Sequence, residues 1–236
     1  MTVPTKLFGS LSDRYPEPDE DDVAIDAGKT VVSLVPVLGP LTVATLGNIF
    51  TPPLEQRRKD WFKEVADGLD DLRAKVEGFS PEKLADHPAF VSAFVQASRI
   101  AEGTHQTEKR DLLRNALLNI AIGHAPSEDM QHIYLRWIGE LTPTHIRLLN
   151  LLWSPFQLLA GKIDQLQMQR GIPLLDGVQL LYPELNKDRH LLEACLLDLS
   201  NAGLSNNRTI DQVLGAPGVT NVGIDFLNFV GKSPIG

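Results

Sequence analysis

The most distinctive pattern along the chain is an apolar window over residues 30–54, which contains no Asp, Glu, Lys or Arg. Its densest part, residues 31–50, has the length of a helix that spans the roughly 30 Å hydrocarbon layer of a membrane. Pro36 and the pair Gly39-Pro40 interrupt this window, because proline lacks a backbone donor and clashes with the preceding helical turn. We therefore predict two short apolar helices, joined as a helical hairpin at residues 38–40, rather than a straight span.

After this window, apolar residues recur at three- and four-residue spacing, which places them on one face of a helix. The clearest such helix should open at Pro52-Pro53, because proline fits the first turn of a helix, and should stop at Gly78. Its apolar face consists of Trp61, Phe62, Val65, Leu69, Leu72 and Val76.

Further helices follow in close succession. They are predicted over residues 88–103 and 106–123, from Ser127, from Thr142 and over residues 188–202, with Ser, Thr or Pro at most of their starts. In the first of them, Phe90, Val91, Phe94, Val95, Ser98 and Ala101 should share a face. The predicted fold class is therefore all-α, mainly a multi-helix bundle.

The pattern changes towards the C-terminus. A helix over residues 156–170, a short apolar piece over 174–181 and the helix over 188–202 are followed by residues 208–213 and 219–230, separated by a Gly/Pro turn cluster. Those last two segments predict a small β-hairpin. Three helices and a hairpin are the order of a winged-helix module. We place this small winged-helix-like module at residues 141–236 and a helical domain that contains the apolar hairpin at residues 23–140.

The composition of the chain indicates its compartment and its net charge. The chain has 236 residues, of which 43% are hydrophobic and 22% charged, as in soluble globular proteins. Residues 1–22 carry six acidic and two basic residues together with Pro16 and Pro18, which predicts an acidic disordered arm. The net charge of −8 argues against nucleic-acid binding. The single cysteine, Cys195, and a start without a signal-peptide pattern indicate a cytoplasmic protein.

Two sequence pairs have the spacing of ligands in di-iron helix bundles, Glu102-x-x-His105 and Asp129-x-x-His132. Such a site also needs core-facing carboxylates from two more helices, and the candidates Glu64 and Glu140 lie on polar faces. We interpret both pairs as surface charge, and we expect no metal and no cofactor.

No catalytic motif is present either. Thr104, His105 and Glu108 lack an oxyanion loop, and Cys195 lies on an apolar stripe, which favours an inert buried thiol. The segment Gly28-Lys29-Thr30 resembles the end of a phosphate-binding loop, but Val23 stands where that loop requires glycine. We expect a protein that is not an enzyme.

Several longer motifs resemble a known family. They are SLVPVLGP at residues 33–40, PLEQRRKDWFKEVADGLDDL at 53–72, FVSAFVQASRIAEGTHQTEKRDLLRNALLN at 90–119 and LTPTHIRLLNLL at 141–152. Together they look like the bacterial abortive-infection alpha proteins, over most of residues 33–230. The resemblance implies a role in phage defence, with action on the host membrane, and it supplies no catalytic residues. The acidic arm departs from that pattern.

These observations lead to one main hypothesis and two alternatives. The main hypothesis is a non-enzymatic defence protein, cytoplasmic or peripheral to the inner membrane, that meets lipid or a protein partner through residues 30–54. The alternatives are a soluble, oligomeric protein-interaction module and a winged-helix DNA-binding regulator. The expected contact residues are Leu34, Val37, Leu38, Leu41, Leu46, Phe50, Arg57, Arg58 and Lys59. The last three are basic and would lie at lipid head groups.

Overall fold

The computed structural model describes residues 43–164, 171–214 and 218–231, and these residues are mainly helical, in agreement with the all-α prediction. Contacts divide the chain into two units, residues 1–59 and residues 60–236. Of the apolar helical hairpin predicted over residues 30–54, residues 30–42 lie outside the described residues and residues 43–54 are helical. The acidic arm, residues 1–22, also lies outside the described residues.

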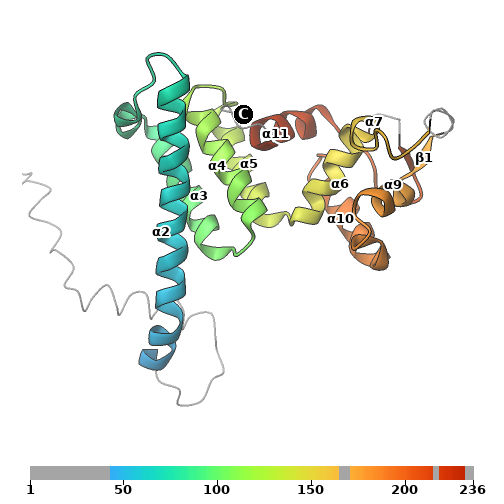
Figure 1. Ribbon diagram of the computed structural model, residues 1–236, viewed down its shortest axis with the longest axis horizontal. Coiled ribbons are helices and arrows are strands. Elements are labelled where there is room, and N and C mark those ends of the chain that lie inside the picture. Colours follow the sequence, from blue (N-terminus) through green and yellow to red (C-terminus); the bar gives the residue numbers. More distant parts are fainter. Residues whose placement is uncertain (1–42, 165–170, 215–217, 232–236) are drawn as a thin grey trace, which may run out of the picture. The chain divides into compact units, whose positions relative to one another are not determined.

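The described part of the first unit is the beginning of helix α2 (Val43–Lys75), which contains Pro52 and Pro53 (Figure 1). The prediction that this proline pair opens a helix is therefore wrong, because the helix starts nine residues before it. Proline removes one backbone donor and fixes φ near −65°, which is itself a helical value. Two adjacent prolines therefore remove two backbone hydrogen bonds from α2, and the helix can continue on either side of them.

In the second unit, four further helical segments follow the end of α2. They are η2 (Pro81–Asp86), α3 (Pro88–Gly103), α4 (Thr107–Ala121) and α5 (Glu128–Glu140). Helix α3 packs against α4 and α5, and α4 packs against α5. Trp61 in the second half of α2 is fully buried, and its indole N–H donates to Ser98 Oγ on α3 over 2.9 Å. A buried indole needs such a partner, so this bond fixes α2 against α3.

The chain continues through α6 (Pro143–Trp153), α7 (Pro155–Leu158), β1 (Ile172–Pro173), α9 (Leu174–Leu181), η3 (Leu185–Lys187), α10 (Arg189–Asn201), β2 (Val213–Leu214) and α11 (Asn221–Gly231). Strands β1 and β2 pair antiparallel, with Ile172 opposite Leu214. Helix α6 packs against α10, and α9 packs against both strands and α6. The helix predicted over residues 156–170 is interrupted, because α7 ends at Leu158 and Gly161 turns the chain with a φ of 75°; residues 165–170 lie outside the described residues.

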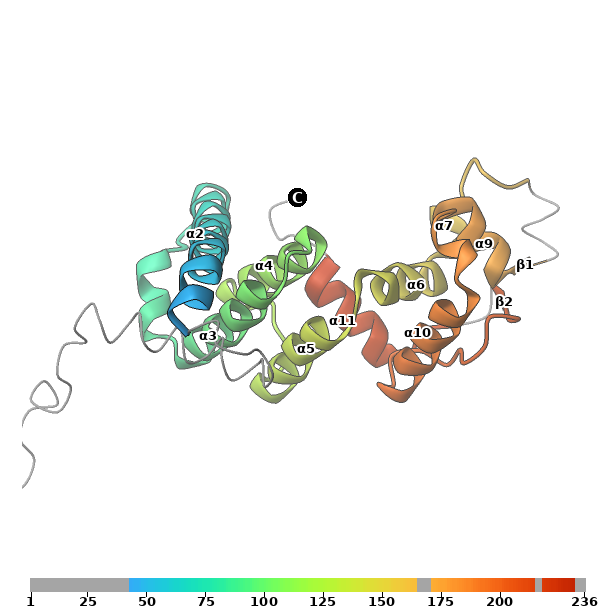
Figure 2. The same ribbon diagram turned by 90° about the horizontal axis from the view of Figure 1, so that it is seen from below.

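The predicted C-terminal β-hairpin is wrong. Residues 221–231 form α11, and β2 pairs with β1 instead of with the segment after residue 218. The buried residues of α11 are Gly223, Phe226, Leu227, Phe229 and Val230. Their three- and four-residue spacing is helical, and α11 uses this face to pack against α4 and α6 (Figure 2).

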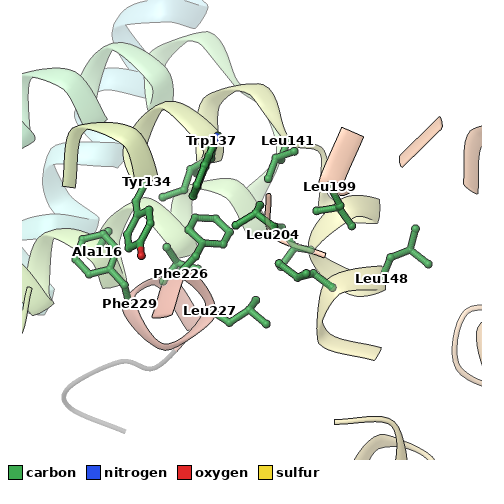
Figure 3. Close-up of a cluster of buried hydrophobic side chains, with 14 of the residues drawn as sticks. Ala116, Tyr134, Trp137, Leu141, Leu148, Leu199, Leu204, Phe226, Leu227 and Phe229 are labelled. Carbon is green, nitrogen blue, oxygen red and sulfur yellow. The ribbon is translucent and has the colours of Figure 1, made fainter. Parts of the chain in front are cut away.

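An aromatic cluster joins α5 to α11 (Figure 3). The rings of Tyr134 and Trp137 on α5 stack with centroids 5.5 Å apart. Phe226 on α11 meets both rings edge-on, at 5.5 Å from Tyr134 and 5.7 Å from Trp137. Phe229 completes the cluster at 5.5 Å from Tyr134. Edge-to-face contacts at these distances are favourable, so the cluster is a main anchor of α11.

Two predicted apolar faces differ from the structure. Phe62 lies on the surface of α2, where it stacks on Phe94 at 5.7 Å, and Val91 and Val95 of α3 are exposed. The buried face of α3 instead includes Ala93 and Ala97, whose small side chains allow close packing. The predicted buried face of α3 favoured larger apolar residues, and two of these, Val91 and Val95, face solvent in the structure.

Candidate functional site

The expected contact residues are only partly covered by the structure. Leu34, Val37, Leu38 and Leu41 lie outside the described residues, and Leu46 lies in α2, where only its backbone is described. The remaining four, Phe50, Arg57, Arg58 and Lys59, belong to α2 and have described side chains, as does the neighbouring Leu54.

Two apolar side chains stand out on this part of α2. Phe50 is 47% exposed and Leu54 is 37% exposed. Residues four apart share one helix face, and Arg58 continues the same row. Arg58 and Lys59 are exposed and Arg57 is half-buried. The described part of the segment therefore combines an exposed apolar pair with adjacent basic residues on one helix.

The structure does not assemble the di-metal pairs. Helix α3, which carries Glu102, ends at Gly103, so His105 lies in the following loop, two residues past the helix. His132 and Asp129 are exposed on α5. Among the residues that the structure describes, no group of three or more His, Cys, Asp or Glu side chains could hold a metal ion.

A cluster that the sequence did not predict connects α6 with α10. His145 Nδ1 accepts hydrogen bonds from the Thr142 backbone N–H at 3.1 Å and from its hydroxyl at 2.8 Å, which forms a capping box at the start of α6. The other ring nitrogen, Nε2, lies 3.4 Å from Asp198 Oδ2 on α10. Nδ1 accepts from a backbone amide, so Nε2 carries the proton of the neutral ring. Burial lowers the pKa of His145, although Asp198 opposes this shift.

Cys195 lies beside this cluster, also on α10. Its side chain is 1% exposed, and burial raises the pKa of the thiol to about 11, with a smaller contribution from Asp198. A reactive cysteine needs a lowered pKa, because the thiolate is the nucleophile. The combination of Cys195, His145 and Asp198 is therefore a packed junction between two helices, with the wrong electrostatics for a nucleophile–base pair.

A cavity of about 740 Å³ lies between the end of α4, the loop before α5, α5 and α11. Its apolar walls come from Val76, Ile122, Pro126, Met130, Val222 and Phe229. Its polar groups come from Asn119, His124, Tyr134, Asp225 and Asn228. We call this space the Tyr134 cavity. Its volume lies within the roughly 300–1,000 Å³ typical of ligand pockets.

Tyr134 gives the cavity its chemistry. The residue is only 2% exposed, and no described residue forms a hydrogen bond with its hydroxyl. Burial raises the pKa of this hydroxyl, and the negative charge of Asp225 raises it further. Sequence patterns could not reveal this site, because Tyr134 and Asp225 lie 91 positions apart and meet only when α11 packs beside α5.

A second hollow of about 740 Å³ lies between α3 and α5. Val91, Val95 and Ile100 form its apolar part. Arg99 and Arg136 contribute positive charge, and Glu140, which lies 3.9 Å from Arg136, contributes a negative charge. Val91 and Val95 are exposed because α3 buries the face that contains Ala93 and Ala97 instead. This hollow is an apolar groove with a border of mixed charge.

Comparisons with protein-family models, with curated proteins and with solved structures find no match to this chain. In the part of the chain that the structure covers, no helix combines the length and the apolar character needed to traverse a lipid bilayer.

Proposed function

We propose that this protein is a non-enzymatic bacterial defence protein of the abortive-infection type, which acts by attaching its apolar N-terminal segment, residues 30–54, to an anionic membrane surface. The observation that carries the proposal is the exposed pair Phe50 and Leu54, followed on the same helix by Arg57, Arg58 and Lys59. The apolar helical hairpin expected for residues 30–54 would supply the remaining apolar contacts.

The energetics favour a membrane surface as the partner of this pattern. Full burial of a Leu or Phe side chain contributes about 1.5–3 kcal/mol, and each Lys or Arg near an anionic surface contributes about 1 kcal/mol. An amphipathic helix of this kind lies in the plane of the interface, with its apolar side chains below the head groups. Salt should weaken the electrostatic share of the binding and leave the apolar share in place.

Vesicle flotation tests this proposal. The full-length protein should float with vesicles that contain phosphatidylglycerol and only weakly with phosphatidylcholine vesicles. The double variant Phe50→Glu/Leu54→Glu should remain at the bottom of the gradient. The matched control is Leu197→Glu, because Leu197 on α10 is 48% exposed and lies far from residue 54 in the sequence. It should float like the wild type.

Two results would contradict the membrane proposal. One is a wild-type protein that floats with neither vesicle, and the other is a double variant that floats as well as the wild type. If the wild type instead forms a defined oligomer by light scattering, and the double variant dissociates it, the segment serves as a protein-interaction surface. A bacterial culture that expresses the protein and gains no protection against a panel of phages would contradict the defence role.

The winged-helix-like arrangement is a second part of the proposal. The order α6, β1, α9, α10, β2 and the β1–β2 pairing support it. In such a module α10 would be the helix that reads DNA. Arg189 at its start is bound to Glu193 at 2.8 Å and to Asp211 at 2.9 Å, so its charge is already balanced. This favours a module that contacts protein.

A gel-shift titration separates these two uses of the module. The protein should not bind mixed-sequence duplex DNA at low salt. A salt-dependent shift that disappears on Arg189→Ala would overturn this reading and support the DNA-binding regulator.

A further inference from the structure

We propose that the Tyr134 cavity binds a small amphipathic organic cation. Its ammonium group would lie between the Asp225 carboxylate and the Tyr134 hydroxyl, and its apolar part would lie against Met130 and Phe229. The cavity is built from residues 76–229, so this binding is independent of the membrane attachment proposed for residues 30–54.

The Tyr134 hydroxyl is the first group of the cavity that a ligand could engage. The Tyr134 side chain is 2% exposed and lines an open volume, and none of the described residues bonds to its hydroxyl. This hydroxyl is not among the fully buried polar atoms without a partner, so it keeps a small surface that a ligand in the cavity can reach. In Figure 3 the Tyr134 hydroxyl lies on the side of its ring that faces Phe229 and Ala116, away from Trp137. A ligand with an N–H donor would satisfy this oxygen.

The charge of the cavity lining favours a cation. Asp225 is an exposed acidic side chain in the lining, which includes neither Lys nor Arg. No described Lys or Arg forms an ion pair with Asp225. His124, the other titratable group apart from Tyr134, lies exposed at the edge of the cavity. A bound anion would therefore meet the carboxylate without compensation, whereas a cation would pair with it.

Two aromatic rings form part of the cavity wall. Phe229 and Tyr134 both line the cavity, with ring centroids 5.5 Å apart. Both rings are almost fully buried, at 4% and 2% exposed, so they offer a ligand apolar contact rather than an open ring face. Ile122, Met130 and Val222 offer apolar surface a short distance away. This combination fits a molecule with a cationic end and an aliphatic body better than it fits a sugar or a nucleotide.

A matched series of probes tests the proposal on the full-length protein. Hexylammonium, 1-hexanol and hexanoate have the same chain length and differ in the charge of the head group. Titration calorimetry should give one hexylammonium site per chain. 1-Hexanol should bind about three- to fivefold more weakly, because a partly exposed ion pair contributes up to about 1 kcal/mol. Hexanoate should bind more weakly still.

Variants then assign the site. Asp225→Asn should reduce hexylammonium binding to the level of 1-hexanol. Tyr134→Phe should weaken hexylammonium binding while the midpoint of thermal unfolding stays within a few degrees of the wild type. Asp176→Asn is the matched control, because Asp176 is an exposed carboxylate on α9 outside the cavity, and it should leave binding unchanged.

Three outcomes would overturn the proposal. They are the absence of hexylammonium binding, equal binding of hexylammonium and hexanoate, and wild-type binding by the Asp225→Asn variant. As a test that does not depend on charge, Val222→Trp should narrow the cavity and weaken binding of both hexylammonium and 1-hexanol. Retained binding in that variant would place the ligand elsewhere.

Discussion

Asn119 on α4 donates its side-chain amide to the backbone carbonyl oxygen of Phe229 on α11, across 2.9 Å. Asn115, one turn earlier on α4, makes the same bond to the carbonyl oxygen of Val230 at 3.1 Å. The last four carbonyls of a helix have no partner within that helix. Two buried asparagines of α4 therefore cap the end of α11, and they do so next to the wall of the Tyr134 cavity.

The first prediction concerns this cap. Asn119→Leu keeps the approximate volume of the side chain and removes the N–H donor. The buried carbonyl oxygen of Phe229 then loses this hydrogen bond. The free energy of unfolding should fall by about 1–3 kcal/mol in urea titrations followed by circular dichroism. Gln179→Leu is the control, because Gln179 is exposed on α9, and it should change stability little. Equal urea midpoints for wild type and Asn119→Leu would show that the cap is not stabilising.

The second prediction concerns Gly223 at the start of α11. A Cβ atom at this position would collide with the carbonyl oxygen of Leu204 and with Val219. The backbone N–H of Gly223 also donates to Thr220 Oγ1 at 3.0 Å, which holds the turn in place. Gly223→Ala should therefore displace α11 and cost about 1–3 kcal/mol or more, measured as a lower thermal midpoint.

Gly103→Ala is the matched control for that experiment. An added Cβ at Gly103, the last residue of α3, meets nothing within 4 Å. Alanine should be tolerated there without loss of stability. A Gly223→Ala protein as stable as Gly103→Ala would contradict the close approach between α11 and the segment around Leu204.

The third prediction is a pH dependence from His145. Burial lowers the pKa of His145 in the folded protein, so below pH about 6.5 the unfolded chain takes up a proton that the folded protein resists. Stability should therefore decrease as the pH falls from 7.5 to 5. His145→Gln keeps a capping-box acceptor and cannot titrate, so it should lose less stability over the same range.

The control for this pH series is His132→Gln, since His132 is exposed on α5. Its urea midpoints should follow the wild type at each pH. The assignment to His145 fails if the His145→Gln protein shows the same pH slope as the wild type.

The fourth prediction concerns the thiol of Cys195. With a pKa of about 11, roughly one thiol in a thousand is ionised at pH 8. Alkylation by iodoacetamide should therefore be at least about a hundredfold slower in the folded protein than in urea. The thiol introduced by Ala194→Cys, at an exposed neighbouring position, should react quickly in the folded protein. Equal rates for both thiols would contradict the burial of Cys195.

Much of the helical architecture follows from local patterns. The predicted helices over residues 88–103, 106–123 and 188–202 agree with α3, α4 and α10 to within two residues at each end. Their starts carry local signals, such as His87 Nδ1 accepting from the Phe90 N–H and Asp188 Oδ1 accepting from the Leu191 N–H. Signals of this kind depend on residues three positions apart, so the sequence displays them directly.

The errors arise where distant segments decide the structure. Residues 219–230 follow a Gly/Pro turn cluster, which led to the prediction of a β-hairpin. They form a helix because Phe226 and Phe229 fit against Tyr134 of α5. The Tyr134 cavity has the same origin, since its walls come from α4, α5 and α11. Neither Tyr134 nor Asp225 carries a motif that identifies it, and only the packing of these helices brings them together.

The hydrogen bond between Asn119 and Phe229 joins residues 110 positions apart, so it can form only late in translation. A ribosome adds about 5–20 residues per second, so α4 waits roughly 5–20 s after its own translation before α11 can arrive. During that interval the apolar face of α4 that α11 will cover, with Asn115 and Asn119 at its edge, is open to other contacts. Chaperone binding to nascent chains that stop before residue 221, and its loss in chains that extend past residue 231, would be the cellular trace of this delay.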